Sequence, residues 1–414
     1  FLGPLNGQSL VSPQQVQQEV DKIFSSLEGQ LAPGAAVLVV KDKEIILNKG
    51  YGYANLEAKS PITPETRFDL ASVAKQFTGY AIALLIERGE LSETDEVRQY
   101  IPDLPDFGQT ITIGHLLHHT SGLRDWTSIL PLMGRSFDDA ISMDHILRMV
   151  YQQKGLNFEP GSEYTYSNTG YNMLAEIVQR VSGISFREWT DKNIFQPLGM
   201  EQTFFLDDHQ EVIPNRAHSY FKRGDLPFLK ATNLLTAVGS SSLFSSTTDL
   251  SLWVSHLLHP AAEFKPAVER MFQTELLNDG NENNYAYGIS KSSFRGTNWI
   301  SHSGSWAAFR TYLVLLPAYD LAVVVLNNND RSAYQTARRI ASLYVAEPDA
   351  EDSDESLTDA IEVALSKQTL DEFTGTYRLG KAWYVHLTRD GDKLWTQATD
   401  EDIFPMKAIA DSVF

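Results

Sequence analysis

The 414-residue sequence predicts a mixed α/β (α+β) fold, in which an antiparallel sheet is flanked by helices and joined to an all-helical lobe. Strand-like apolar runs occur near both ends of the first 345 residues, at 35–40, 44–47, 298–302, 311–316 and 321–326. Between them, residues 90–290 show mostly helical patterns and loops interrupted by proline and glycine. Strands contributed from both ends imply one sheet, with the helical stretch as an insert lying on it.

The elements follow in order along the chain. Ser12 followed by Pro13 is typical of a helix start, because a hydroxyl caps the first turn and proline is favoured there. Gly29 is expected to end this helix. The first two strands form a hairpin around residues 41–43, and residues 72–88 are predicted to be a long helix. An amphipathic helix is expected from 332 to 345, after the last strand of the sheet.

The composition excludes several classes of partner and site. The chain has 34 Lys and Arg against 53 Asp and Glu, a formal charge of −19. This balance argues against nucleic acid or an anionic membrane surface as the main partner, because both need basic patches. The absence of cysteine excludes disulfides, thiolate nucleophiles and Cys-ligated metal sites. The apolar runs are far shorter than the ~20 residues that span a bilayer, so no transmembrane segment is expected.

Ser72 and Lys75 are the first candidate catalytic residues. They lie three residues apart at the start of a predicted helix, so their side chains share one helical face. A serine hydroxyl needs a nearby base to become a good nucleophile, and a lysine in a desolvated pocket can be neutral enough to serve. The N-terminal end of the helix also offers positive potential where an acyl oxyanion would form. On this motif alone, a capped helix with a surface lysine remains the commoner explanation.

Two further motifs carry groups that complete such a site. Tyr166 and Asn168 lie in a loop over 161–171, where a phenol can relay a proton and an amide can hold a substrate amide. His302, Ser303 and Gly304 end a predicted strand, where glycine would let a substrate backbone approach the strand edge. Taken singly, these motifs could equally be a turn with an aromatic anchor and a strand histidine without a catalytic task.

Together, the three motifs resemble the serine β-lactamase and penicillin-binding-protein superfamily, over most of residues 15–345. The matching segments are 68–78, 113–123, 166–171 and 197–200. The nearest branch is the group of class C β-lactamases, D-Ala-D-Ala carboxypeptidase B and esterases, the CubicO-type hydrolases. The resemblance implies a β-lactamase/transpeptidase-like fold and a serine nucleophile without a cofactor or metal.

The resemblance also implies a role for each matching residue. Ser72 would form the acyl-enzyme with Lys75 as its base, and Tyr166 would pass the proton to the leaving group. Asn168 would hold the substrate amide, and His302 would face the far end of the substrate.

The strand that follows His302 has an implied role as well. The backbone N–H groups of Ser72 and Ser305 would form the oxyanion hole, with Ser303 and Gly304 beside the bound substrate. The family often has Lys-Thr-Gly where this chain has His-Ser-Gly, and this departure places β-lactam hydrolysis in doubt. We expect His302 to gain its proton only as the pH falls toward 6, since the reference pKa of histidine is about 6.5.

The sequence is compatible with three functions, all with a small-molecule or peptide substrate. The first is a peptidase, carboxypeptidase or amidase acting on substrates that contain D-residues. The second is a carboxylesterase or acyltransferase with the same machinery. The third is a catalytically weak binding or scaffold protein that shares the fold.

Three histidines and three aromatic residues are assigned to structure instead. His115, His118 and His119 are expected on one helical face and could mimic a metal site, but structural roles are favoured. The aromatic side chains expected to belong to the core are Trp126, Trp306 and Phe309.

The domain prediction divides the chain into 1–346, an acidic linker over 347–369 and a partial β domain over 370–414. Residues 347–355 contain six acidic side chains, which favours a solvated linker. The last segment has too few strands to close a lipocalin-like barrel, so it should dock on the main domain or on a second copy as a homo-oligomer. The lack of cysteine and the start at Phe1 favour a periplasmic or secreted protein, with the cytoplasm not excluded.

Overall fold

A computed structural model describes residues 11–222, 227–346, 365–378, 384–391, 393–398 and 404–406. The chain divides into two compact units, Phe1–Glu347 and Pro348–Phe414. The acidic stretch 347–355 lies outside the described residues.

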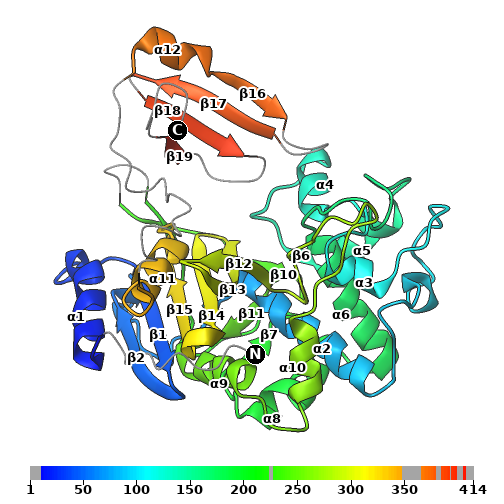
Figure 1. The fold of residues 1–414 in the computed structure, drawn as a ribbon, viewed down its shortest axis with the longest axis horizontal. Helices are drawn as coiled ribbons and strands as arrows, with labels where there is room; N and C mark the ends of the chain where they lie inside the picture. The colour runs from blue at the N-terminus through cyan, green and yellow to red at the C-terminus, as the bar shows by residue number, and fades with distance from the viewer. Residues whose placement is uncertain are drawn as a thin grey trace. The chain divides into compact units, whose positions relative to one another are not determined.

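The centre of the first unit is a six-stranded antiparallel sheet in the order β12-β13-β14-β15-β1-β2 (Figure 1). Its strands are β1 (Ala35–Lys41), β2 (Glu44–Tyr51), β12 (Ser290–Phe294), β13 (Thr297–Trp306), β14 (Phe309–Leu316) and β15 (Leu321–Asn327). Strands from the two ends of the unit lie side by side, with Leu38 opposite Val324 in the β1–β15 pair. The predicted sheet, built from both ends of the unit, is therefore confirmed.

Helices cover both faces of this sheet. Alternate residues of a strand point to opposite faces, and β1 and β15 are apolar on both, so both faces need cover. Helices α1 (Pro13–Phe24) and α11 (Ala333–Ala341) pack on one face, and α9 (Thr247–Leu258) packs on the other. Ser12 caps α1 as predicted, but α1 ends at Phe24 and a 3₁₀ turn (Ser25–Leu27) leads to Gly29.

The other helices of the first unit include those that form the helical lobe. They are α2 (Lys75–Glu87), α3 (Ile113–Leu117), α4 (Trp126–Leu132), α5 (Met143–Tyr151), α6 (Asn168–Ser182), α7 (Phe186–Thr190), α8 (Gln196–Leu198) and α10 (Lys265–Met271). Helix α2 packs against both α6 and α10, and its residues from Lys75 to Leu85 are all buried. The long helix predicted from residue 72 begins instead as a 3₁₀ turn (Ala71–Ala74), so α2 itself begins at Lys75.

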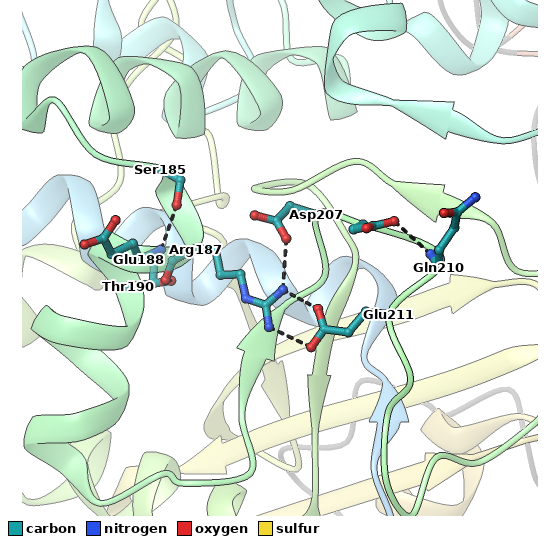
Figure 2. A network of polar contacts seen from close by, with 8 residues as sticks. Ser185, Arg187, Glu188, Thr190, Asp207, Gln210 and Glu211 are labelled. Atoms are coloured by element: carbon teal, nitrogen blue, oxygen red, sulfur yellow. Dashed lines mark hydrogen bonds and ion pairs between the residues drawn. The ribbon is translucent and has the colours of Figure 1, made fainter.

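The first unit also has short strands that form small sheets separate from the six-stranded one. They are β3 (Tyr53–Asn55), β4 (Ser60–Pro61), β5 (Phe68–Asp69), β6 (Ile141–Ser142), β7 (Phe204–Phe205), β8 (Tyr220–Phe221), β9 (Leu229–Lys230), β10 (Leu235–Thr236) and β11 (Leu243–Ser245). Beside β7, Arg187 of α7 makes two hydrogen bonds to the Glu211 carboxylate and one to Asp207 (Figure 2). The bonds from Arg187 to Glu211 lower the pKa of the Glu211 carboxyl, and all three bonds hold α7 to the segment that follows β7.

The second unit contains α12 (Lys367–Glu372) and a four-stranded antiparallel sheet in chain order. Its strands are β16 (Gly375–Arg378), β17 (Tyr384–Asp390), β18 (Lys393–Ala398) and β19 (Phe404–Met406). Among its described residues, Leu370 and Leu394 are the buried apolar side chains. Throughout the described part of the chain, no helix combines the length and apolar character needed to cross a membrane.

Candidate active site

Ser72 lies in the 3₁₀ turn (Ala71–Ala74) between β5 and α2, and we call residues 69–74 the Ser72 turn. The residue before it, Ala71, has a φ of +47°, a left-handed conformation that costs energy for a residue with a Cβ. Asp69 holds this conformation, since its Oδ1 accepts a hydrogen bond of 2.9 Å from the Ala71 N–H. Its Oδ2 accepts a bond of 2.8 Å from Asn233. The neighbours of this turn thus hold its strained conformation in place.

Strand β13 packs directly against this turn at Gly304. A Cβ atom at position 304 would lie 2.2 Å from Thr311 Oγ1 and 2.3 Å from the Leu70 carbonyl oxygen. Thr311 itself donates a hydrogen bond of 2.8 Å to that same carbonyl. Only glycine therefore allows β13 to come this close to the residues before Ser72.

Lys75 is fully buried and its Nζ lies near three oxygens. These are Ser72 Oγ at 3.2 Å, Asn168 Oδ1 at 2.8 Å and the Ser240 carbonyl oxygen at 2.8 Å. Burial lowers the pKa of Lys75 to about 7, and the negative charge of Asp125 opposes the shift. Two of the three oxygens are carbonyls that can only accept, so a neutral Lys75 donates to them and directs its lone pair at the Ser72 hydroxyl.

The aromatic ring of Tyr166 lies beside the amino group of Lys75. The Lys75 Nζ is 4.8 Å from the centroid of its ring, and burial strongly raises the pKa of the phenol. A hydrogen bond with Ser72 acts in the opposite direction on that pKa. Tyr166 is therefore a neutral phenol beside both Ser72 and Lys75, with a hydroxyl that can donate a proton.

Asn168 is the first residue of α6, and not part of the loop in which the sequence placed it. Ser167 caps the helix by accepting a hydrogen bond from the Gly170 N–H. The Asn168 side chain is held from two sides, because Oδ1 accepts from Lys75 and Nδ2 donates to Asp125 Oδ2 at 3.2 Å. The Nδ2 group of Asn168 carries a second hydrogen that can donate to another group.

His302 is buried and neutral, which corrects the expectation that it gains a proton near pH 6. Its Nδ1 lies 2.6 Å from the Ser303 carbonyl oxygen, so this nitrogen carries the proton. Its Nε2 lies 2.8 Å from the Tyr285 hydroxyl, which must then donate to it. Burial, with a smaller contribution from the charge of Lys75, lowers the pKa of His302 to about 3.

The strand from His302 to Trp306 offers a backbone edge. Strand β12 pairs with β13 only as far as Ser301, and in the described part of the chain no strand continues that pairing. The side chains of Ser303 and Ser305 are exposed on this segment. An extended chain could therefore pair with the edge directly after His302.

The predicted histidine face is wrong. Helix α3 ends at Leu117, His118 is its C-cap residue, and His119 has a φ of +61°. His119 instead packs on the tyrosines of the site, with its ring 4.5 Å from that of Tyr166 and 4.3 Å from that of Tyr285. Among the residues described, no three His, Asp or Glu side chains are grouped as a metal ion would require.

Two of the three aromatic residues assigned to the core, Trp126 and Phe309, are indeed buried. The third, Trp306, is only partly buried and donates a hydrogen bond of 3.1 Å to Asn233 Oδ1.

Sequence reasoning missed several groups that hold the site. The Ser240 carbonyl has no sequence signal, because any residue carries one. Asp125 precedes Thr127 in a helix N-cap pattern, which indicates a cap but not the contact with Asn168. Asp69 and Tyr285 reach the site through contacts distant in sequence.

Comparisons with known proteins show which family and fold this chain shares. The family described as "Beta-lactamase" matches residues 20–347. Protein flp of Staphylococcus aureus (strain N315) is 30% identical over 324 residues, covering 75% of this chain but only 63% of flp. Penicillin-binding protein 4* of Bacillus subtilis (strain 168) is 27% identical over 409 residues, covering 95% of this chain and 90% of that protein.

A solved structure shares the fold. The octameric penicillin-binding protein homologue from Pyrococcus abyssi has a TM-score of 0.72 and 24% identity to this chain. The similarity covers 95% of this chain and 90% of that one.

Proposed function

This chain belongs to the β-lactamase family and is a serine hydrolase, and we propose that it cleaves amide or peptide bonds of substrates that contain D-residues. One observation supports Ser72 as the nucleophile above all others. The Nζ of Lys75 lies 3.2 Å from Ser72 Oγ while two carbonyl oxygens occupy its N–H groups. A base with a pKa of about 7 is then directed at the serine hydroxyl.

In the proposed first half-reaction, Ser72 Oγ attacks the substrate carbonyl carbon as its proton moves to Lys75 Nζ. The backbone N–H groups of Ser72 and Ser305 stabilise the oxyanion of the tetrahedral intermediate. Tyr166 donates its proton to the leaving amine nitrogen and is reprotonated from Lys75, so the C–N bond breaks and a neutral amine departs. Water then attacks the acyl-enzyme along the reverse proton path, which releases the acid and restores Ser72.

The strand edge supports a peptide-like substrate. An extended backbone can add to the edge between His302 and Trp306, and the free Asn168 N–H can hold the substrate carbonyl. Both nitrogens of the neutral His302 imidazole already bond to Ser303 and Tyr285, so this side chain provides no fixed positive charge for a substrate carboxylate.

The neutral state of the His302 imidazole also favours a second candidate function, a carboxylesterase or acyltransferase. A site without a fixed cation does not demand a free carboxylate on its substrate, and simple esters lack one. The same serine, lysine and tyrosine would serve, with an alcohol as the leaving group.

A substrate panel tests the proposal. We expect D-aminoacyl amides and D-Ala-D-Ala peptides to show higher kcat/KM than their L-isomers, short-chain esters and a chromogenic cephalosporin. Esters turned over far better than any amide, with no preference between D and L forms, would support the second candidate. If no substrate of the panel is turned over and a serine-reactive fluorophosphonate does not label Ser72, both candidate functions are overturned. Ser72→Ala provides the background rate for every substrate.

Assembly and location belong to the proposal as well. The Pyrococcus abyssi homologue is described as octameric, which supports a homo-oligomer of this chain. We propose that the C-terminal segment forms this assembly. Light scattering on the full chain tests this directly, and a monomer at micromolar concentration would contradict it. A periplasmic or secreted location is tested by fractionation of the source cells.

A further inference from the structure

The carboxylate of Asp125, at the N-terminus of α4, is the most densely hydrogen-bonded acid near the proposed site. Oδ1 accepts from the Thr127 N–H at 2.8 Å and from Thr127 Oγ1 at 2.9 Å. Oδ2 accepts from both the backbone N–H and the side-chain Nδ2 of Asn168. All four partners donate, which stabilises the ionised carboxylate although burial acts to raise the pKa of Asp125.

We propose that Asp125 is a positioning residue that holds the Asn168 amide with its carbonyl toward Lys75 and stabilises the protonated form of that lysine. It would touch neither the substrate nor the reacting atoms. This inference rests on the proposed function, in which Lys75 must lose its proton before Ser72 can attack.

The first part of the role concerns the orientation of an amide. An amide turned by 180° would present an NH₂ group to Lys75 Nζ, two donors facing each other. Asp125 Oδ2 accepts only, so it selects the orientation with Nδ2 toward itself and Oδ1 toward Lys75. With Oδ1 and the Ser240 carbonyl both fixed as acceptors, the lone pair of the neutral lysine has Ser72 as its remaining direction.

The second part concerns charge. The titratable groups around Lys75 besides Asp125 are Tyr166, Tyr171, His119 and His302. Burial raises the pKa of both tyrosines and lowers the pKa of both histidines, so these four groups are neutral at pH 7. Asp125 therefore supplies the negative charge of this group, and it opposes the effect of burial on Lys75.

The test is the rate of labelling by a fluorophosphonate as a function of pH, on the full chain. The rate should rise with pH as Lys75 loses its proton. In Asp125→Asn and Asp125→Ser, we expect the midpoint of this rise to move to lower pH by roughly one unit, because an opposite charge has been removed. We also expect the plateau rate to fall roughly tenfold or more, because a charged hydrogen bond to Asn168 is lost. Asp125→Ser keeps an oxygen that can cap α4, so it remains informative where Asp125→Asn folds poorly.

Asp125→Glu and Asp144→Asn are the matched controls. Glutamate keeps the negative charge but does not place it where the Asp125 carboxylate lies. The pH midpoint of labelling of Asp125→Glu should therefore stay near that of the unmodified protein, while its plateau rate falls. Asp144 is an acid in the first turn of a different helix, α5, and its replacement should change neither quantity.

The outcomes separate this inference from the proposed function. If the unmodified protein is not labelled, or Ser72→Ala is labelled equally, the proposed function fails. If labelling depends on Ser72 and Lys75 but the folded Asn and Ser variants keep the original midpoint, the role of Asp125 is wrong.

Discussion

The carbonyl oxygen of Leu70 occupies the space in which a side chain at Gly304 would begin, 2.3 Å from the position of its Cβ. Leu70 belongs to the Ser72 turn, and Gly304 lies in the strand that carries the proposed second oxyanion donor, Ser305. The absence of one side chain therefore sets how closely the two halves of the proposed oxyanion hole approach.

Gly304→Ala should separate these halves. The new methyl group meets a backbone oxygen that cannot rotate away, and overpacking of this kind typically costs about 1–3 kcal/mol. We expect a lower thermal midpoint and a labelling rate reduced roughly a hundredfold, as when an oxyanion donor is lost. Gly155→Ala is the control, because a Cβ there meets no atom within 4 Å. Equal, small effects of the two substitutions would contradict the close approach.

The pH dependence of acylation should report Lys75. Its pKa is about 7, and the neutral form is the base, so labelling should be slow at pH 5.5 and rise through pH 7 to a plateau. Lys75→Met should abolish this rise and leave a residual rate that does not depend on pH. Lys291→Met is the control, since that lysine donates to the Phe272 carbonyl on another part of the fold. A profile for the unmodified protein that is flat from pH 5.5 to 9 would rule out this assignment.

His302 should remain neutral throughout this range. With its pKa lowered to about 3, its imidazole should show no titration between pH 5 and 8. Nitrogen NMR of histidine-labelled protein should show the proton on Nδ1, with His302→Gln used to assign the signal. Binding of carboxylate substrates should therefore not tighten through His302 as the pH falls to 6. A His302 signal that titrates near pH 6.5 would contradict this prediction and show that His302 gains a proton near pH 6.

The second unit should be dispensable for acylation. All residues proposed for catalysis lie within Phe1–Glu347, and few apolar residues of the second unit are buried among those described. A chain ending at Glu347 should keep its labelling rate within about threefold, a change of under 1 kcal/mol. Its oligomeric state or substrate range should change instead. Loss of labelling in a truncated protein that still melts cooperatively would show that the second unit completes the site.

Patterns local in sequence predicted the sheet and the pairing of Ser72 with Lys75. The apolar runs of β1 and β15 indicate buried strands whatever surrounds them, and a spacing of three residues places two side chains on one helical face. Helix boundaries were less accurate, because the Ala71–Ala74 turn is imposed by Asp69, β13 and Thr311 and not by its own residues.

Contacts distant in sequence decided the rest. The Nε2 atom of His302 accepts a hydrogen bond from Tyr285, and the orientation of Asn168 depends on Asp125, 43 residues earlier. The Ser240 oxygen is a backbone atom, so no residue type marks it. A sequence motif indicates which groups are candidates for catalysis. The protonation states of these groups depend on neighbouring residues that the motif does not contain.

Intact mass after reaction with a fluorophosphonate tests the central claim, that Ser72 is the single nucleophile, most directly. The unmodified protein should gain the mass of one phosphonyl group, and peptide mapping should place it on Ser72. Ser72→Ala should gain none, while Ser240→Ala should be labelled normally, because that residue reaches Lys75 through its backbone carbonyl. Continued labelling of Ser72→Ala, or a phosphonyl group mapped to any other residue, would contradict the account.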